Sequence, residues 1–263
     1  MSSSNNEKNI IEQNPIWFPM GDHGLILDFT GFKPLSDDIA FAPTAELAAK
    51  ILHISEMIRM ANISAISEIV PSMTRLFIAF DPLQQDASQI KQLILPLLNS
   101  TGEQTTSTGT HWRLPVCYEG DCAPDLSEVA ERVDLSEEEV IKRHLANTLT
   151  VSVMGFLPGN GYMAGVDERL TLPRRDNPRV AVPARSVGIA IGQCVIYPMD
   201  SPGGWHLIGR TPFPTFDPKR DNPILFSAGD KVSFERISLE TLAQQEEEYQ
   251  NGLLTENDLK VTE

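Results

Sequence analysis

The chain has 263 residues, of which 41% are hydrophobic, so it can bury one large core or two smaller ones. Its net charge is −15, which argues against nucleic acids and anionic membranes as partners because both require basic surfaces. Three cysteines and five scattered histidines favour reduced thiols and no metal site. The N-terminus lacks the apolar stretch of a signal peptide, and no apolar run could span a membrane, so we expect a cytoplasmic protein.

The N-terminal half is predicted to be a ferredoxin-like α/β domain over residues 16–108, after a disordered polar tail at 1–15. Its predicted elements are, in chain order, strands 16–20 and 25–29, helix 43–60, strands 65–70 and 74–80, and helix 87–98. The order strand, helix, strand, strand, helix, strand is the split βαβ pattern of a ferredoxin-like sandwich. A strand at 111–117 is either the last strand of this domain or the first of the next one. A linker rich in Ser, Thr and Gly is expected at 99–109.

Residues 109–240 are predicted to form a compact β-barrel that also contains two small helices, so the fold class is α+β. The helices are expected at 124–133, with Asp125 as the N-cap, and at 136–145. Short β-type runs, separated by glycine and proline, are found at 150–153, 181–182, 187–191, 194–197, 205–208 and 231–237. Residues 241–263 are predicted to be an acidic, partly helical tail.

Residues 159–164 read Gly-Asn-Gly-Tyr-Met-Ala and fit the dinucleotide-binding pattern G-x-G-x-x-G/A. A nucleotide site also needs a helix that opens at the motif, and no helical apolar period follows before Pro173. We therefore favour a loop whose backbone approaches either a ligand or the next strand. The chain contains no P-loop motif, so ATP, if it is used, is not held in a P-loop of this chain.

The candidate ligand-binding residues lie in the glycine-, proline- and arginine-rich stretch 151–210. Arg174 and Arg179 could clamp a carboxylate or phosphate, or could pair with nearby acids. Gln193 interrupts an apolar strand, so its amide either reads a ligand or bonds to the backbone. Gly203 and Gly204 could present consecutive backbone N–H groups to an anion or carbonyl. The remaining candidates in these turns are Tyr162, Tyr197, Ser201, Trp205 and Arg210.

Two further observations limit the catalytic assignments. His144 ends a predicted helix, where a positive charge would suit the helix dipole, so a catalytic role is not required to explain it. The cysteines are expected to be buried hydrophobes, and Trp205 could plug the core beneath a tight turn. No catalytic residue is assigned from spacing alone.

Several stretches resemble the allophanate hydrolase subunit 1 family: GFLPGNGYMAG, LPRRDNPRVAVPARSVGIAIGQCVIYPMDSPGGWHLIGRT and AGDKVSF, with GDHGL, EIVPSMTRLFIAFDP and VCYEGDCAPDL before them. The resemblance implies a small α/β domain followed by a cyclophilin-like β-barrel. Relatives usually carry P-G-F-x-Y and V-P-A-G-S-V, where this chain has Asn160 and Arg185. Arg185 either fills a pocket or forbids a positive φ at that position.

The resemblance also implies a function and partners. The family includes the B subunit of an ATP-dependent 5-oxoprolinase, which converts 5-oxoproline to L-glutamate together with the C subunit (allophanate hydrolase subunit 2-like) and the A subunit of that enzyme. It also includes the kinase inhibitor KipI, so binding to a histidine kinase is an alternative. Membership of a biotin-dependent urea or amide carboxyltransferase is another.

Overall fold

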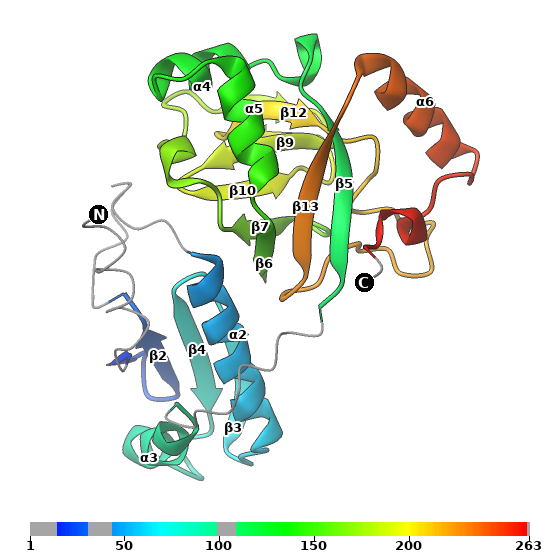
Figure 1. Cartoon of the computed structure of the whole chain (residues 1–263). Coiled ribbons are helices and arrows are strands. Elements are labelled where there is room, and N and C mark those ends of the chain that lie inside the picture. Colours follow the sequence, from blue (N-terminus) through cyan, green and yellow to red (C-terminus); the bar gives the residue numbers. More distant parts are fainter. Residues whose placement is uncertain (1–14, 31–43, 99–108, 262–263) are drawn as a thin grey trace. The chain divides into compact units, whose positions relative to one another are not determined.

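The computed structural model describes residues 15–30, 44–98 and 109–261 (Figure 1). The described residues divide into two compact units, one that contains residues 15–30 and 46–98 and another that contains residues 44–45 and 109–261. Nearly all of the predicted tail 1–15 and of the predicted linker 99–109 lies outside the described residues. Within the described ranges, no helix is both long enough and apolar enough to cross a membrane.

The first unit is a four-stranded antiparallel sheet with two helices. Its elements are β1 Ile16–Pro19, β2 Gly24–Asp28, α2 Ala45–Met60, β3 Ile66–Pro71, β4 Arg75–Phe80 and α3 Ala87–Leu98. The order of strands in the sheet is β1-β2-β4-β3. Apolar residues at helical spacing on α2, among them Ile51 and Ile58, are fully buried, as are Leu27 and Ile78 of the sheet. Their burial gives this unit its own core.

The ferredoxin-like arrangement predicted for this unit is not confirmed. The part from β2 to α3 follows the predicted strand–helix–strand–strand–helix order. However, β5 His111–Cys117, the candidate last strand, pairs with strands of the second unit. The sheet edge beside β2 is instead occupied by β1, which forms a hairpin with β2 through the turn around Gly21.

The second unit contains a closed barrel with the strand order β10-β7-β6-β13-β5-β12-β9. Its strands and helices after β5 are α4 Leu126–Arg132, α5 Glu137–Ala146, β6 Leu149–Met154, β7 Gly161–Ala164, β8 Arg179–Val182, β9 Ser186–Ala190, β10 Gln193–Ile196, β11 Ser201–Gly203, β12 His206–Arg210, β13 Lys231–Ile237 and α6 Leu239–Gln250. Within the described part of the chain, strands β8 and β11 pair only with each other and form a separate ribbon. The barrel is closed by β13 and β5, which run parallel.

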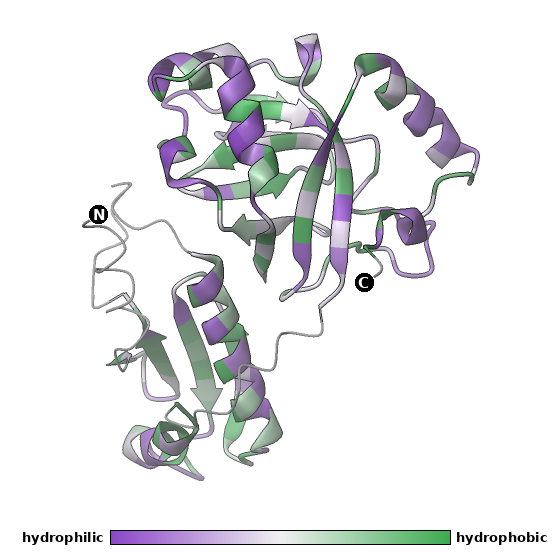
Figure 2. Cartoon of the chain, in the orientation of Figure 1, coloured by the Kyte–Doolittle hydropathy of each residue, from purple (hydrophilic) through white to green (hydrophobic). Residues whose placement is uncertain are grey.

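Side chains on alternate positions of the strands point into the barrel and fill its interior. On β10, Cys194 and Ile196 belong to the interior cluster, together with Met163 of β7, Ile189 of β9 and Phe234 of β13. Helices α4 and α5 contribute buried residues to the same cluster, while their outward surfaces are hydrophilic (Figure 2). Because side chains on a strand alternate between its two faces, Val195 of β10 and Tyr197, which follows the strand, lie in a second cluster on the outer face.

Most of the region predicted to be an acidic tail packs against the barrel. Leu242 of α6 is buried in a small cluster with Cys117 and Cys122. Leu259 joins the barrel core, and Lys260 forms a bridge to Trp112 of β5. Figure 2 shows α6 as mainly hydrophilic apart from this contact, which agrees with the predicted acidic composition.

Candidate functional site

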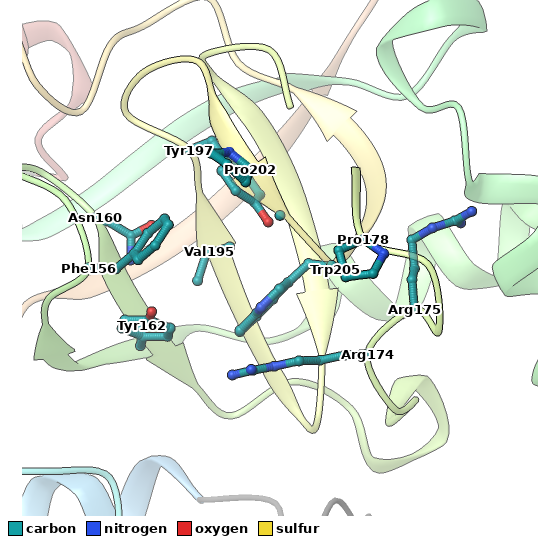
Figure 3. Close-up of a pocket in the computed structure, with 12 residues that line it drawn as sticks. Phe156, Asn160, Tyr162, Arg174, Arg175, Pro178, Val195, Tyr197, Pro202 and Trp205 are labelled. Atoms are coloured by element: carbon teal, nitrogen blue, oxygen red, sulfur yellow. The ribbon is translucent and has the colours of Figure 1, made fainter. Parts of the chain in front are cut away.

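A pocket lies on the outer face of β7 and β10, where the barrel meets the β8–β11 ribbon. Its cavity measures about 240 Å³, and its floor contains Tyr162, Val195 and Trp205 (Figure 3). The rings of Tyr162 and Trp205 are tilted at 55° with centroids 5.9 Å apart. Residues 161–164 of the motif thus form strand β7 and carry Tyr162 into a pocket, and no nucleotide-binding helix opens at the motif.

Tyr197 and Gly203 fit closely together at one side of this pocket. A Cβ atom at Gly203 would overlap the Tyr197 hydroxyl, so only glycine allows this approach. Burial raises the pKa of Tyr197 to about 12, although a hydrogen bond with the Trp205 backbone acts in the opposite direction. Burial also raises the pKa of Tyr162. Both phenols are therefore protonated at neutral pH and can donate hydrogen bonds.

The expected backbone nest at Gly203 and Gly204 is not formed. Both residues line the pocket, but neither has a positive φ, so the left-handed half of a nest is missing. The Gly204 carbonyl instead accepts a hydrogen bond of 2.7 Å from the Arg175 backbone N–H. Gly203 pairs with Arg179 in the β8–β11 ribbon. Gly203 acts here by permitting the close approach of Tyr197, whereas Gly204 has only ordinary contacts.

Arg174 is the cation that the pocket leaves exposed. No hydrogen bond or ion pair joins its guanidinium to any other residue in the described ranges. The side chain extends past Trp205 towards Tyr162 (Figure 3). Its backbone is fixed on both sides, because His206 Nε2 lies 3.0 Å from the Pro173 carbonyl and the Arg175 N–H bonds to Gly204.

The neighbouring arginines, Arg175 and Arg179, form ion pairs with Asp125, a buried carboxylate that is 2% exposed. Arg179 binds it through two hydrogen bonds of 2.9 and 2.6 Å, and Arg175 through one of 2.9 Å. Arg175 also bonds to Glu128 at 2.7 Å. Arg179 is therefore absent from the pocket lining; it pairs with an acid, as the alternative predicted, but with the distant Asp125 and not with an acid near it in the sequence.

The prediction that the Asp125 side chain caps helix α4 is wrong. Asp125 occupies the N-cap position of α4, but its side chain makes no capping hydrogen bond. Besides the two arginines, the carboxylate accepts a hydrogen bond of 2.7 Å from the Leu207 N–H. Asp125 thus connects the segment that carries Arg174 to the strand that follows Trp205.

Three other predicted site residues lie outside the pocket lining. Gln193 on β10 and Ser201 on β11 are buried, and Gln193 Oε1 and Ser201 Oγ have no hydrogen-bond partner within the described part of the chain. Arg210 at the end of β12 bonds to Glu246 of α6 at 3.3 Å and to the Ala184 carbonyl at 3.0 Å. The structure thus brings together Arg174, Tyr162, Tyr197, Gly203, Gly204 and Trp205.

The two departures from the family pattern have different consequences. Arg185 keeps a positive φ of 69° despite its side chain, which bonds to the Pro212 carbonyl and to Glu246, each at 3.1 Å. The substitution therefore did not forbid the left-handed conformation. Asn160 is 2% exposed and lines the pocket, and its Nδ2 donates a hydrogen bond of 3.0 Å to the Gly155 carbonyl.

His144 is buried and neutral, which contradicts the predicted interaction of its charge with the helix dipole. Its Nδ1 lies 2.7 Å from the Tyr118 hydroxyl, and its Nε2 lies 3.6 Å from Cys194 Sγ. Burial lowers the pKa of His144 to about 4 and raises that of Cys194. The pair lacks both access to solvent and a thiolate, so it is a packing feature of the core.

Sequence reasoning missed Phe156, Pro178, Val195 and Pro202 among the residues that line the pocket. Phe156 sits in the glycine- and proline-rich stretch GFLPGNG, so an aromatic residue within a demanding turn was the available signal. None of the lining residues is a carboxylate, an imidazole or a thiol. In the described ranges, no group of at least three His, Cys, Asp and Glu residues could hold a metal ion.

Comparison with known proteins agrees with this architecture. The family described as carboxyltransferase domain, subdomain C and D, matches residues 17–226. The chain is 48% identical over 125 residues to the B subunit of 5-oxoprolinase from Bacillus subtilis, and the matched segment covers 48% of this chain and 52% of the relative. It is 42% identical over 161 residues to the B subunit of 5-oxoprolinase from Haemophilus influenzae, covering 61% and 72%.

A solved structure also has a fold similar to that of this chain. The conserved uncharacterized protein PH0987 from Pyrococcus horikoshii superposes with a TM-score of 0.50 at 31% identity, covering 86% of this chain and 100% of that protein. The match to the Bacillus subtilis relative spans about half of that protein's length. The chain therefore belongs to the carboxyltransferase domain, subdomain C and D family, in agreement with its resemblance to allophanate hydrolase subunit 1 and to the B subunit of 5-oxoprolinase.

Proposed function

We propose that this chain is the B subunit of an ATP-dependent 5-oxoprolinase-type amidohydrolase, which works in the cytoplasm with homologues of the C and A subunits of that enzyme. The observation that carries the proposal is the guanidinium of Arg174, which has no partner among the described residues and lies beside an aromatic pocket in a chain with a net charge of −15. A cation left free in such an acidic protein suits an anionic ligand. The identity with proteins named as 5-oxoprolinase B subunits gives the ligand class.

The groups that line the pocket support 5-oxoproline as the proposed ligand. Arg174 would pair with the carboxylate, and the aromatic floor would contact the ring methylenes. Tyr162 and Tyr197 are protonated donors that could bond to the lactam carbonyl and stabilise the negative charge that develops on its oxygen. Attack of water at that carbonyl would break the lactam C–N bond while the ring nitrogen takes up a proton, and a second water is consumed in the hydrolysis of ATP, so the products are glutamate, ADP and phosphate.

The rest of the catalytic machinery is assigned to the partners. No general base lines the pocket, since it contains no carboxylate, imidazole or thiol. One unpaired guanidinium suits one carboxylate but not a triphosphate, which needs several donors or a glycine-rich loop. We therefore place ATP on a partner polypeptide, and we expect no turnover by this chain alone.

The test is ATP-dependent release of glutamate from 5-oxoproline by the co-expressed subunits. Arg174→Ala should raise KM about 10- to 100-fold, because a charge-assisted hydrogen bond contributes about 1.5–3 kcal/mol. Arg236→Ala is the matched control, since Arg236 forms an exposed ion pair with Glu138 away from the pocket lining. No glutamate release by the wild-type complex would refute the function, and an unchanged KM in Arg174→Ala would refute the site.

The matched family favours a second candidate, a component of a biotin-dependent carboxyltransferase that acts on urea or another amide. A planar amide could use the same tyrosine donors without Arg174. Transfer of a carboxyl group from carboxybiotin by the co-expressed subunits, with no glutamate formed from 5-oxoproline, would support this candidate. The KipI-like alternative predicts instead that the chain alone binds and inhibits a sensor histidine kinase.

A further inference from the structure

Phe156 is an aromatic side chain in an unfavourable position. It lies in the loop between β6 and β7, at the rim of the pocket, and is 63% exposed. Its φ is +73°, in the left-handed region. For a bulky residue this conformation is a genuine outlier, because Cβ approaches the following carbonyl oxygen. Phe156 therefore carries backbone strain without the burial that usually compensates for it.

Comparison with other left-handed residues in the described ranges shows how unusual this is. Asn62 and Asp134 also have positive φ, at 46° and 53°, but their short polar side chains tolerate the region. Ile191 has a φ of 46° but is partly buried in the apolar cluster around Val195. Arg185 has a φ of 69°, but its side chain is held by Pro212 and Glu246. Strain at an exposed residue that lines a pocket points to a role in binding.

The surrounding loop holds Phe156 in this conformation. The Gly155 N–H donates to the Asn160 carbonyl at 3.1 Å, and the Asn160 N–H donates to the Leu157 carbonyl at 3.1 Å. The Asn160 side chain adds its hydrogen bond to the Gly155 carbonyl. Gly159, with a φ of 81°, packs so closely on Thr215 and Phe216 that a side chain there would clash. Because the loop is fixed at both ends, the ring of Phe156 is presented in a defined place.

All four aromatic and apolar residues Phe156, Tyr162, Val195 and Trp205 line the pocket, and Figure 3 shows Phe156 on the same side of Val195 as Tyr162. We infer that Phe156 is a ligand-binding residue whose ring covers the apolar face of a small cyclic carboxylate, the carboxylate itself pairing with Arg174. This inference rests on the proposed function for the choice of 5-oxoproline as the ligand. The contact of an aromatic ring with the ligand offsets the strain only when the ligand is bound.

The test compares Phe156→Gly with the wild type in the co-expressed complex. Glycine relieves the strain and removes the ring, so KM for 5-oxoproline should rise about three- to tenfold while Tm stays equal or increases. Asp134→Gly is the matched control, since it relieves a left-handed residue in the turn between α4 and α5 and should leave KM unchanged. Phe156→Tyr keeps the aromatic face and should retain the wild-type KM.

A second readout does not depend on turnover. In thermal unfolding of the full chain, 5-oxoproline should raise the Tm of the wild type and of Phe156→Tyr more than that of Phe156→Gly. A lower Tm of Phe156→Gly without ligand, with unchanged KM, would overturn the inference and make Phe156 a structural residue. Loss of co-purification with the partner subunits would also overturn it, because Phe156 would then be an interface residue. An inactive wild-type complex would refute the proposed function, and the ligand-induced Tm shift would still decide the role of Phe156.

Discussion

Asp125→Asn should destabilise the barrel unit by about 3 kcal/mol. The carboxylate is almost fully buried and accepts hydrogen bonds from Leu207, from Arg175 and, twice, from Arg179. Removing one partner of a buried ion pair costs about 3–5 kcal/mol because the other charge is left uncompensated. Arg175 retains Glu128, so the loss falls mainly on Arg179, which gives the lower end of that range.

The assay is urea unfolding followed by tryptophan fluorescence in a Trp17→Phe background. Trp112 and Trp205, the remaining tryptophans, both lie in the second unit and report on the barrel alone. Glu138→Gln is the matched acid-to-amide control, since its ion pair with Arg236 is exposed and should contribute less than about 1 kcal/mol. If Asp125→Asn and Glu138→Gln shifted the free energy of unfolding equally, the assignment of Asp125 as a central buried ion pair would be wrong.

Further predictions concern burial and backbone strain. The pKa of His144 is about 4 in the folded state and about 6.5 in the unfolded state, so as the pH is lowered the unfolded state binds the proton at a higher pH. The free energy of unfolding should therefore decrease by about 1.4 kcal/mol for each pH unit as the pH falls from 6.5 to 4. His144→Gln should remove this part of the slope in pH-dependent urea unfolding. Gly203→Ala should displace Tyr197 and raise KM in the assay of glutamate release, whereas Gly204→Ala should have little effect, because only ordinary contacts surround Gly204. Arg185→Gly should be more stable in urea than Arg185→Ala by about 1 kcal/mol, since only glycine relieves the φ of +69°; equal stability would contradict the strain.

The sequence predicts the elements of this fold well wherever local periodicity is strong. The run 194–197 is predicted as a strand and corresponds to β10, and helix 87–98 corresponds to α3. The barrel strand β7 and the ribbon strand β11 are missed because they are short and contain glycine, which carries no apolar pattern. Closure of the barrel by β5 and β13 is also beyond local signals, since these strands come from distant parts of the chain.

The candidate site is predicted only in part, for a related reason. Arg174 and Arg179 look equivalent in sequence, yet only Arg179 faces Asp125, which lies 54 residues earlier. The same carboxylate resembles a helix cap when only its neighbours are considered. The glycine- and proline-rich loop around Phe156 indicates a demanding turn, but it does not show that the positive φ falls on Phe156 itself. Residues whose role depends on a distant partner or on backbone conformation therefore require coordinates.

The parallel pairing of β13 with β5 has a consequence for how the second unit is made. During synthesis, His111–Cys117 leaves the ribosome long before Lys231–Ile237. The barrel therefore cannot close until β13 has been made and pairs with β5. Until then the main-chain groups of the waiting strand have no partner on that side and can attract other chains. Chaperones or rapid assembly would matter most in this interval, and truncations that end before residue 231 should aggregate rather than yield a smaller barrel.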